Sequence, residues 1–186
     1  MNQSRRTFVR RAATAATALS LPGMMGARRR VAPSDRIRVG VIGCRGMGFT
    51  DLSSMLKLPD IECAALCDVD ETVLVSRAGE VEEATSMRPD LYGDYRALLD
   101  DDEIDAVIIG TPDHWHCLPM VDACEAGKDV YVEKPLANTI EECEIMVAAA
   151  RRYDRVVQMG QWQRSGQHWM DAVDYLRAGH IGRVRT

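Results

Sequence analysis

The chain has 186 residues, of which 46% are hydrophobic, enough for one ordinary domain of about 100–200 residues with a real core. Its formal net charge of −5 hides an asymmetry: the first 33 residues carry seven arginines and no acid, which leaves 16 basic and 28 acidic residues in the rest. A body with a net charge of −12 repels phosphate backbones, so nucleic acid is excluded as a partner.

Residues 1–33 have the pattern of an export segment. The motif Arg5-Arg6 stands ahead of apolar residues and resembles the twin-arginine signal, and the apolar stretch 12–25 is too short and too weakly hydrophobic for a permanent membrane span of about 20 residues. The twin-arginine export machinery, which carries folded proteins, is therefore a predicted partner. The predicted location is the periplasm, or the periplasmic face of the membrane if the segment is kept as an anchor. The alternative is a basic amphipathic arm.

From Asp35 onward, strand-like and helix-like segments alternate. Branched aliphatic runs predict the strands, and periodic apolar residues with capping signals predict the helices. Strands are expected at 37–42, 61–66, 106–109, 129–132 and 156–159, and helices at 49–58, 70–83, 118–125, 139–153 and 167–178. This alternation predicts an α/β fold with a Rossmann doubly wound parallel sheet over 35–160, followed by a helical segment at 161–186.

A glycine-rich turn lies between the first strand and the first helix. Residues 43–48 read Gly-Cys-Arg-Gly-Met-Gly, so two positions of the G-x-G-x-x-G fingerprint are glycine and the middle one is arginine. Such a turn lets backbone N–H groups approach a pyrophosphate at a helix N-terminus. The candidate cofactor contacts here are Gly43, Arg45, Gly46, Met47 and Gly48.

Asp68 follows the second predicted strand, at the position where the dinucleotide-binding motif has an acidic residue. A carboxylate there accepts hydrogen bonds from adenosine ribose hydroxyls and repels a 2′-phosphate, which favours NAD as the cofactor. Arg45 keeps NADP open, because an arginine nearby can accommodate that phosphate. The alternative is that Asp68 is only a capping acid.

A polar loop follows the strand at 106–109, at the edge of the sheet where ligands bind in open α/β folds. It carries Thr111, Pro112, Asp113, His114 and His116, and two histidines there favour a functional loop. Thr111, Pro112 and His114 are candidate cofactor contacts. No metal site is expected, because no third ligand accompanies the histidines. The six cysteines form no Cys-x-x-Cys pair or zinc framework and are expected to be small buried hydrophobes.

Three segments together resemble the amino-terminal domain of the Gfo/Idh/MocA oxidoreductases, the glucose–fructose oxidoreductase and inositol dehydrogenase family. They are the glycine turn with Asp68, the loop 111–116, and the run 126–136, which contains the Glu133-Lys134-Pro135 signature. The resemblance implies a nicotinamide-dependent oxidoreductase acting on a sugar or cyclitol hydroxyl.

The same resemblance implies roles for particular residues. Lys134 is the implied catalytic acid or base, His116 assists it, Glu133 holds the nicotinamide ribose, and Gln161 lies near the cofactor. It further implies that 161–186 begins a second α/β domain that is absent or truncated here, and a homo-oligomer at full length.

Two other functions remain open. The chain could be a dinucleotide-binding module without catalysis, or a different Rossmann enzyme that reduces an imine or semialdehyde.

Overall fold

The structure is a computed structural model that describes residues 35–183 and 185. The predicted export segment at 1–33 lies outside the described residues and stays a prediction.

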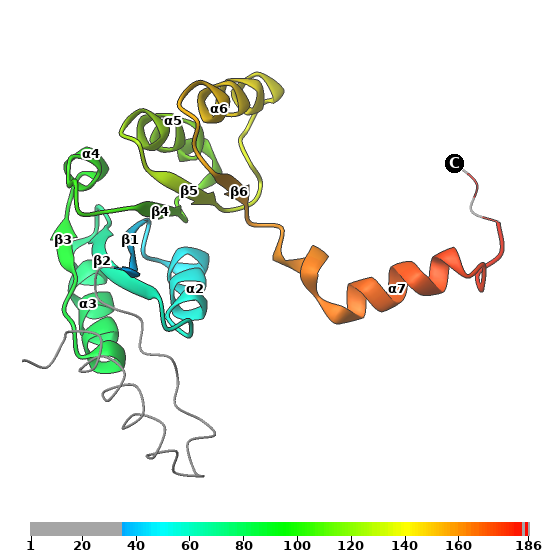
Figure 1. The fold of residues 1–186 in the computed structure, drawn as a ribbon, viewed down its shortest axis with the longest axis horizontal. Coiled ribbons are helices and arrows are strands. Elements are labelled where there is room, and N and C mark those ends of the chain that lie inside the picture. Colours follow the sequence, from blue (N-terminus) through cyan, green and yellow to red (C-terminus); the bar gives the residue numbers. More distant parts are fainter. Residues whose placement is uncertain (1–34, 184, 186) are drawn as a thin grey trace, which may run out of the picture. The chain divides into compact units, whose positions relative to one another are not determined.

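Six parallel strands form one sheet, shown in Figure 1. Their order is β3-β2-β1-β4-β5-β6, which is the doubly wound order of a Rossmann fold and confirms the predicted fold class. The strands are β1 (Ile37–Ile42), β2 (Ile61–Cys67), β3 (Asp90–Tyr92), β4 (Ala106–Ile109), β5 (Asp129–Val132) and β6 (Val157–Met159).

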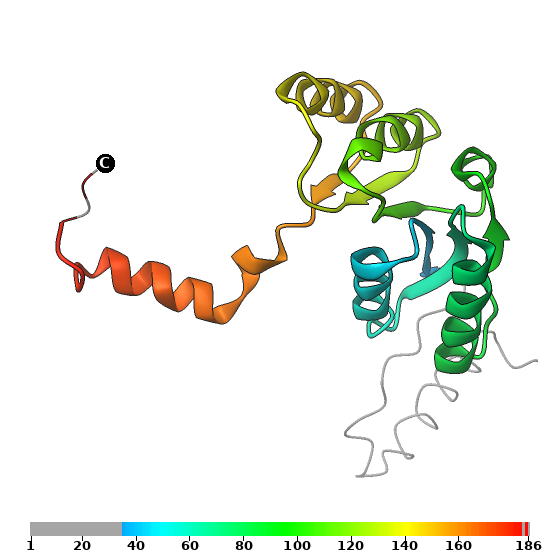
Figure 2. The same ribbon diagram turned by 180° about the vertical axis from the view of Figure 1, so that it is seen from behind.

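The helices between the strands cover both faces of the sheet, as Figures 1 and 2 show from opposite sides. They are α2 (Gly46–Met55), α3 (Glu71–Thr85), α4 (Tyr95–Leu99), α5 (Cys117–Glu125) and α6 (Ile140–Arg152), with the short 3₁₀ turn η2 (Asp113–Trp115). The 3₁₀ turn η3 (Trp162–Ser165) and the helix α7 (Gln167–Arg177) follow β6.

The core has two halves, one on each face of the sheet. Leu52 of α2 and Leu74 of α3 pack with Ile108 on one face, whereas Met120 of α5 packs with Ile109 on the other. Consecutive residues of β4 thus serve opposite faces, as the two-residue period of a strand requires. Burial on both faces explains why the strands read as continuous aliphatic runs.

Side-chain caps fix where two of the predicted helices begin. Asp70 accepts hydrogen bonds from the backbone N–H groups of Thr72 and Val73 at the start of α3. Thr139 and Glu142 form the predicted capping box at the start of α6. Both predicted helix starts are therefore confirmed.

Two elements were not predicted, β3 and α4. The strand has only three residues and follows Pro89, so no periodicity marks it. It exists because its backbone pairs with β2. The first helix also differs from the prediction, since α2 begins within the glycine turn at Gly46 and ends at Met55.

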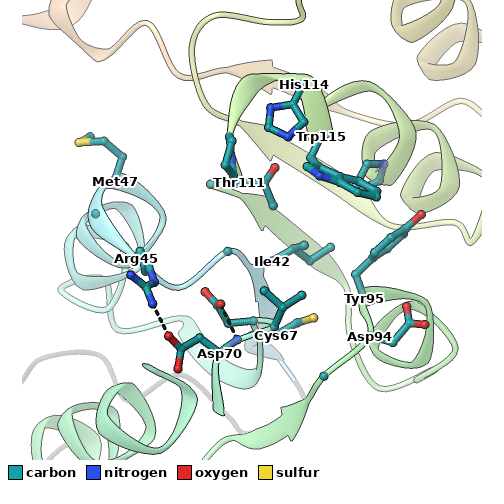
Figure 3. Close-up of a pocket in the computed structure, with 18 of the residues that line it drawn as sticks. Ile42, Arg45, Met47, Cys67, Asp70, Asp94, Tyr95, Thr111, His114 and Trp115 are labelled. Atoms are coloured by element: carbon teal, nitrogen blue, oxygen red, sulfur yellow. Dashed lines mark hydrogen bonds and ion pairs between the residues drawn. The ribbon is translucent and has the colours of Figure 1, made fainter. Parts of the chain in front are cut away.

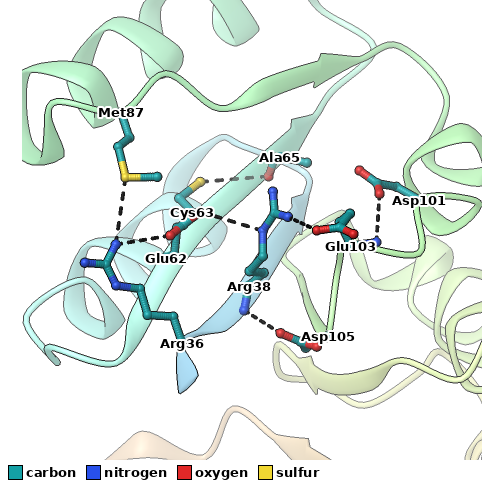
Figure 4. Close-up of polar contacts among 9 residues, drawn as sticks. All are labelled: Arg36, Arg38, Glu62, Cys63, Ala65, Met87, Asp101, Glu103 and Asp105. Carbon is teal, nitrogen blue, oxygen red and sulfur yellow. Dashed lines mark hydrogen bonds and ion pairs between the residues drawn. The ribbon is translucent and has the colours of Figure 1, made fainter. Parts of the chain in front are cut away.

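Ion pairs at the amino ends of the strands help to set the register of the sheet, as Figure 4 shows. Arg36 lies 3.2 Å from Glu62, and the Arg38 guanidinium lies 2.6 Å from Glu103. The backbone N–H of Arg38 donates to Asp105 at 2.7 Å. These contacts join β1, β2 and the approach to β4 at the edge of the sheet opposite the glycine turn.

The helix α7 is exposed over its whole length. Trp169 is 51% exposed, and its ring nitrogen donates to Gln163 at 2.6 Å. No helix of the described part of the chain has the length and apolar character that a membrane crossing requires.

Candidate functional site

A cavity of about 870 Å³ opens at the carboxyl ends of β1, β2 and β4. Figure 3 shows how the side chains around it converge from separate parts of the chain. Of the predicted contacts, Gly43, Arg45, Gly46, Met47, Asp68, Thr111, Pro112 and His114 line it.

The glycine turn is packed directly against the end of β4. Gly43 has a φ of +89°, and its N–H donates to the Cys67 carbonyl at 2.8 Å. A Cβ on Gly48 would overlap the Gly43 carbonyl oxygen, and a Cβ on Gly110 would overlap the Gly48 backbone. These glycines therefore allow a close approach of backbone to backbone that no other residue permits.

The N-terminus of α2 is open to an anion. Arg45 occupies the N-cap position without any side-chain cap, and the first turn carries no acid. Gly46 has a φ of +45°, and nothing lies within 4 Å of the place where its Cβ would be. Unpaired N–H groups and the positive end of the helix dipole therefore face open space, as a pyrophosphate requires.

Asp68 ties two turns of the site together. One of its carboxylate oxygens accepts from the Cys44 N–H at 2.9 Å, and the other accepts from the Asp70 N–H at 3.0 Å. Each oxygen of a carboxylate has two lone pairs, so an acceptor remains for a ribose hydroxyl. Asp68 is thus a support for the glycine turn as well as a candidate ribose contact.

Arg45 forms an ion pair with Asp70 at the rim of the cavity, marked in Figure 3. Hydrogen bonds from Val73 and Thr72, with the guanidinium beside them, lower the pKa of Asp70. Asp70 therefore holds a charge that faces Arg45 at the mouth of the site.

The loop after β4 supplies the far wall of the cavity. The hydroxyl oxygen of Thr111 is buried and has no hydrogen-bond partner among the described residues. His114 has a side chain 58% exposed, and Trp115 is 46% exposed. Because a buried hydroxyl without a partner is costly, Thr111 favours a polar ligand at this wall.

His116 is 1% exposed and does not line the cavity. Its Nδ1 lies 2.7 Å from the Pro135 carbonyl oxygen, and its Nε2 lies 2.8 Å from the Thr111 carbonyl oxygen. Both neighbours are carbonyl oxygens, which only accept, so a neutral ring donates to one of them and the other nitrogen faces the second oxygen. His116 therefore lies between two loops as a tie, and its predicted catalytic role stays a prediction.

Lys134 and Glu133 follow the end of β5. The Glu133 side chain is buried and accepts from the Lys134 N–H at 3.1 Å, whereas the Lys134 side chain is exposed. Gln161, just after β6, is exposed as well. Together with Gly48, these residues are not among those lining the cavity, so their predicted cofactor contacts stay predictions.

Several cavity residues were not predicted from the sequence. Val69, which is 96% exposed, stands beside Asp68 at the lip. Asp94, the N-cap residue of α4, and Tyr95, its first residue, also line the cavity. Outside the cavity, Asp51 of α2 was not predicted either, and burial, with the Glu133 carboxylate beside it, raises its pKa from 3.8 to about 6.

The cysteines are structural. All six are free, and Cys44, Cys63, Cys67 and Cys124 are buried, as predicted. Burial raises the pKa of the Cys44 thiol to about 12, so it is no nucleophile at neutral pH. The described residues hold no group of three metal-ligating side chains.

An open parallel sheet with a glycine turn, an open helix N-terminus and an acid ending the second strand defines the class of dinucleotide-binding Rossmann domains. Residues 37–161 match the GFO_IDH_MocA family, described as an oxidoreductase family with an NAD-binding Rossmann fold. The chain belongs to this family. Its family resemblance and its predicted nicotinamide dinucleotide cofactor are thereby confirmed.

Particular relatives differ in their described activities. A glycosyl hydrolase family 109 protein of Shewanella putrefaciens (strain CN-32 / ATCC BAA-453) is 35% identical over 159 residues, covering 83% of this chain and 35% of the relative. A 3-ketoreductase from Actinomadura kijaniata, in complex with NADP, is 30% identical with a TM-score of 0.70, covering 81% of this chain and 46% of that one.

A scyllo-inositol dehydrogenase from Lactobacillus casei, with bound NAD(H) and scyllo-inositol, has a TM-score of 0.70 at 23% identity. It covers 79% of this chain and 42% of its own, and at this identity it supports the fold alone. The chain thus spans less than half the length of each of these three relatives.

Proposed function

We propose that the chain is the cofactor-binding part of an NAD(P)-dependent oxidoreductase that moves a hydride between nicotinamide and a hydroxyl-bearing carbon of a sugar or cyclitol. The observation that carries this proposal is the continuous cavity from the end of β2, over the glycine turn, to the loop after β4. It has the order of features that an extended dinucleotide requires.

The adenosine end belongs at Asp68 and Val69. A free lone pair of Asp68 accepts a ribose hydroxyl, and the exposed Val69 side chain offers an apolar surface to the base. The Arg45–Asp70 ion pair satisfies Arg45 within the protein, so the arginine is not free for a 2′-phosphate. NAD is therefore the preferred cofactor.

The pyrophosphate belongs at the N-terminus of α2. The backbone N–H groups after Arg45 have no side-chain cap and face open space at Gly46. Thr111, whose buried hydroxyl has no partner among the described residues, stands at the opposite wall and can turn that hydroxyl toward the cofactor.

The substrate belongs beyond the end of β5, at Lys134. When bound, the dinucleotide supplies the site that accepts or gives the hydride. The Lys134 amine exchanges the hydroxyl proton of the substrate, and its exposed side chain is accessible to one. Glu133 fixes the Lys134 backbone by accepting its N–H at 3.1 Å.

Dinucleotide binding and the Lys134→Met variant test this proposal. The chain should bind NAD⁺ by calorimetry, and Lys134→Met should keep that affinity, since Lys134 does not line the cavity. In the protein with its substrate, assayed by nicotinamide absorbance against polyols, sugars and imines, the variant should lose turnover. Absence of any dinucleotide binding refutes the proposal. Binding with no hydride exchange indicates a non-catalytic module, and activity on imines alone indicates a different reductase.

A second candidate is cleavage of a glycoside. The 35% identical relative is called a glycosyl hydrolase, and the similarity covers 83% of this chain. The two candidates separate in one assay, because release of a chromogenic aglycone without net change in nicotinamide absorbance indicates glycoside cleavage. Polyol oxidation produces the absorbance change instead.

We further propose export by the twin-arginine machinery to the periplasm. The supporting observation is Arg5-Arg6 ahead of a short apolar stretch. Replacing both arginines with lysine should retain the protein in the cytoplasm. Unchanged periplasmic appearance would contradict the proposal.

A further inference from the structure

A pair of carboxyl groups lies beside the backbone of Lys134, outside the cavity. Asp51 comes from the second turn of α2, and Glu133 follows β5. Glu133 is 3% exposed, and one of its oxygens, Oε2, accepts the Lys134 N–H at 3.1 Å. A Cβ on Gly160, at the end of β6, would overlap the other oxygen, Oε1. The Glu133 carboxylate therefore occupies a confined place between strand ends.

Two oxygens of this pair have no partner. Asp51 Oδ2 and Glu133 Oε1 are buried without a hydrogen bond among the described residues. Burial raises the pKa of Asp51, and the Glu133 carboxylate is close enough to raise it further, both as a neighbouring charge and through a side-chain hydrogen bond. Ionised carboxylates only accept, so they cannot satisfy one another. One proton between them makes one group a donor to the other and satisfies both.

The surroundings favour holding such a proton. Tyr131 of β5 also faces the pair, and burial with both carboxylates beside it raises its pKa. No lysine or arginine of the described residues forms an ion pair with Asp51 or Glu133. Burial and the Glu133 charge raise the Asp51 pKa to about 6. Without a neighbouring cation, two buried negative charges at one place are unfavourable.

We propose that Asp51 and Glu133 bind a single proton between them and thereby set the charge beside Lys134. The pair carries one negative charge when protonated and two when the proton leaves to solvent. Asp51 acts through Glu133, as a positioning residue, and does not itself touch a substrate.

A consequence for the cofactor rests on the proposed function. A dinucleotide with a positive nicotinamide ring stabilises the doubly charged pair, whereas the reduced, neutral ring does not. Binding of NAD⁺ should then expel the proton to solvent, and binding of NADH should not. No bond in the cofactor changes in this step.

Titration of the protein without cofactor tests the pair itself. Carbon-13 NMR of labelled Asp and Glu carboxyl groups should show the Asp51 and Glu133 signals moving together near pH 6. Asp51→Asn should remove this step, and Asp102→Asn, which changes an exposed acid, should keep it. If neither signal moves above a pH of about 5 in the unmodified chain, the pair does not hold a proton and the proposal is overturned. That measurement decides even if Asp51→Asn fails to fold.

Calorimetry in two buffers of different ionisation enthalpy tests the coupling. At pH 6, where the pair is about half protonated, NAD⁺ should release up to about half a proton for each molecule bound, and NADH should release none. The ratio of NAD⁺ to NADH affinity should rise through the titration, by about tenfold for each unit by which NAD⁺ lowers the pKa of the pair. Asp51→Asn should make the ratio independent of pH, and Asp102→Asn should not.

The NMR titration and the calorimetry test the Asp51–Glu133 pair and the proposed function independently. If neither dinucleotide binds, the proposed function fails while the NMR titration still judges the pair. If NAD⁺ binds and releases no proton, the coupling is overturned although the cofactor site stands.

Discussion

His116→Ala is the sharpest test of how the site is held together. His116 is 1% exposed, and its ring nitrogens lie 2.7 and 2.8 Å from the carbonyl oxygens of Pro135 and Thr111. Removing the ring takes away the N–H donor of one of these oxygens and opens a cavity. An unsatisfied buried group costs about 1–3 kcal/mol, less where water enters, and the cavity adds to this cost. The free energy of unfolding should therefore fall by about 2–4 kcal/mol. That is a large part of the ~5–15 kcal/mol that stabilises a typical domain.

Urea unfolding followed by circular dichroism measures this loss, with His114→Ala as the matched control. The His114 side chain is 58% exposed in the same loop, so its loss should change the unfolding free energy by less than about 0.5 kcal/mol. His116→Gln, which keeps one donor, should fall between the two. A loss below about 1 kcal/mol for His116→Ala would refute the tie. Normal stability and cofactor affinity with lost turnover would support the predicted catalytic role of His116.

Three further predictions concern the turn and its rim. Asp51→Asn should stabilise the fold by about 1 kcal/mol above pH 6, after allowance for partial exposure, and by nothing below a pH of about 4. The carboxyl group of Asp51 has a higher pKa in the folded chain than in the unfolded chain, so its ionisation lowers the free energy of unfolding as the pH rises from 3.8 through about 6. Urea unfolding of both proteins above pH 6 and below a pH of about 4 measures this difference. Asp70→Asn keeps a good helix cap but frees Arg45, so calorimetry should show NADP affinity rising several-fold relative to NAD; an unchanged ratio would contradict this. Gly48→Ala should lower the free energy of unfolding by more than about 2 kcal/mol, because its Cβ would overlap the Gly43 carbonyl oxygen. Gly79→Ala, in open space within α3, should raise it by about 0.5–1 kcal/mol. Equal effects in thermal unfolding would contradict the close packing of Gly48 against Gly43.

The sequence was sufficient for those elements whose signals are local. β1, β2, β4 and β5 are aliphatic runs buried on both faces, and the caps at Asp70 and Thr139 are read from neighbouring residues. β3 depends instead on pairing with β2, a contact that no local pattern encodes. Because β3 and α4 were missed, the cavity contacts of Asp94 and Tyr95 were missed with them.

The same difference between local signals and distant contacts decides which parts of the site were predictable. Gly43 and Asp68 belong to a strand–turn–helix motif with known spacing, so their place in one site was predictable, and both line the same cavity. The Asp51–Glu133 pair joins a helix to a distant strand end, and nothing near Asp51 in the sequence marks it. His116 was predicted to assist catalysis because it lies in a polar loop at this edge of the sheet, and its burial beside two carbonyl oxygens could not be predicted from that loop.

The separation between cofactor contacts and substrate contacts leads to one last expectation. The residues that would hold adenosine and pyrophosphate all line the cavity of the described domain, whereas Lys134 and Gln161 are exposed and lie outside its lining. Dinucleotide affinity should therefore come from the half of the ligand that lacks nicotinamide. In competition against NADH fluorescence, ADP-ribose should bind within a few-fold of NAD⁺, and AMP more weakly because it lacks the second phosphate at α2. If ADP-ribose binds far more weakly than NAD⁺, the nicotinamide end dominates, and the described cavity is not the principal source of affinity.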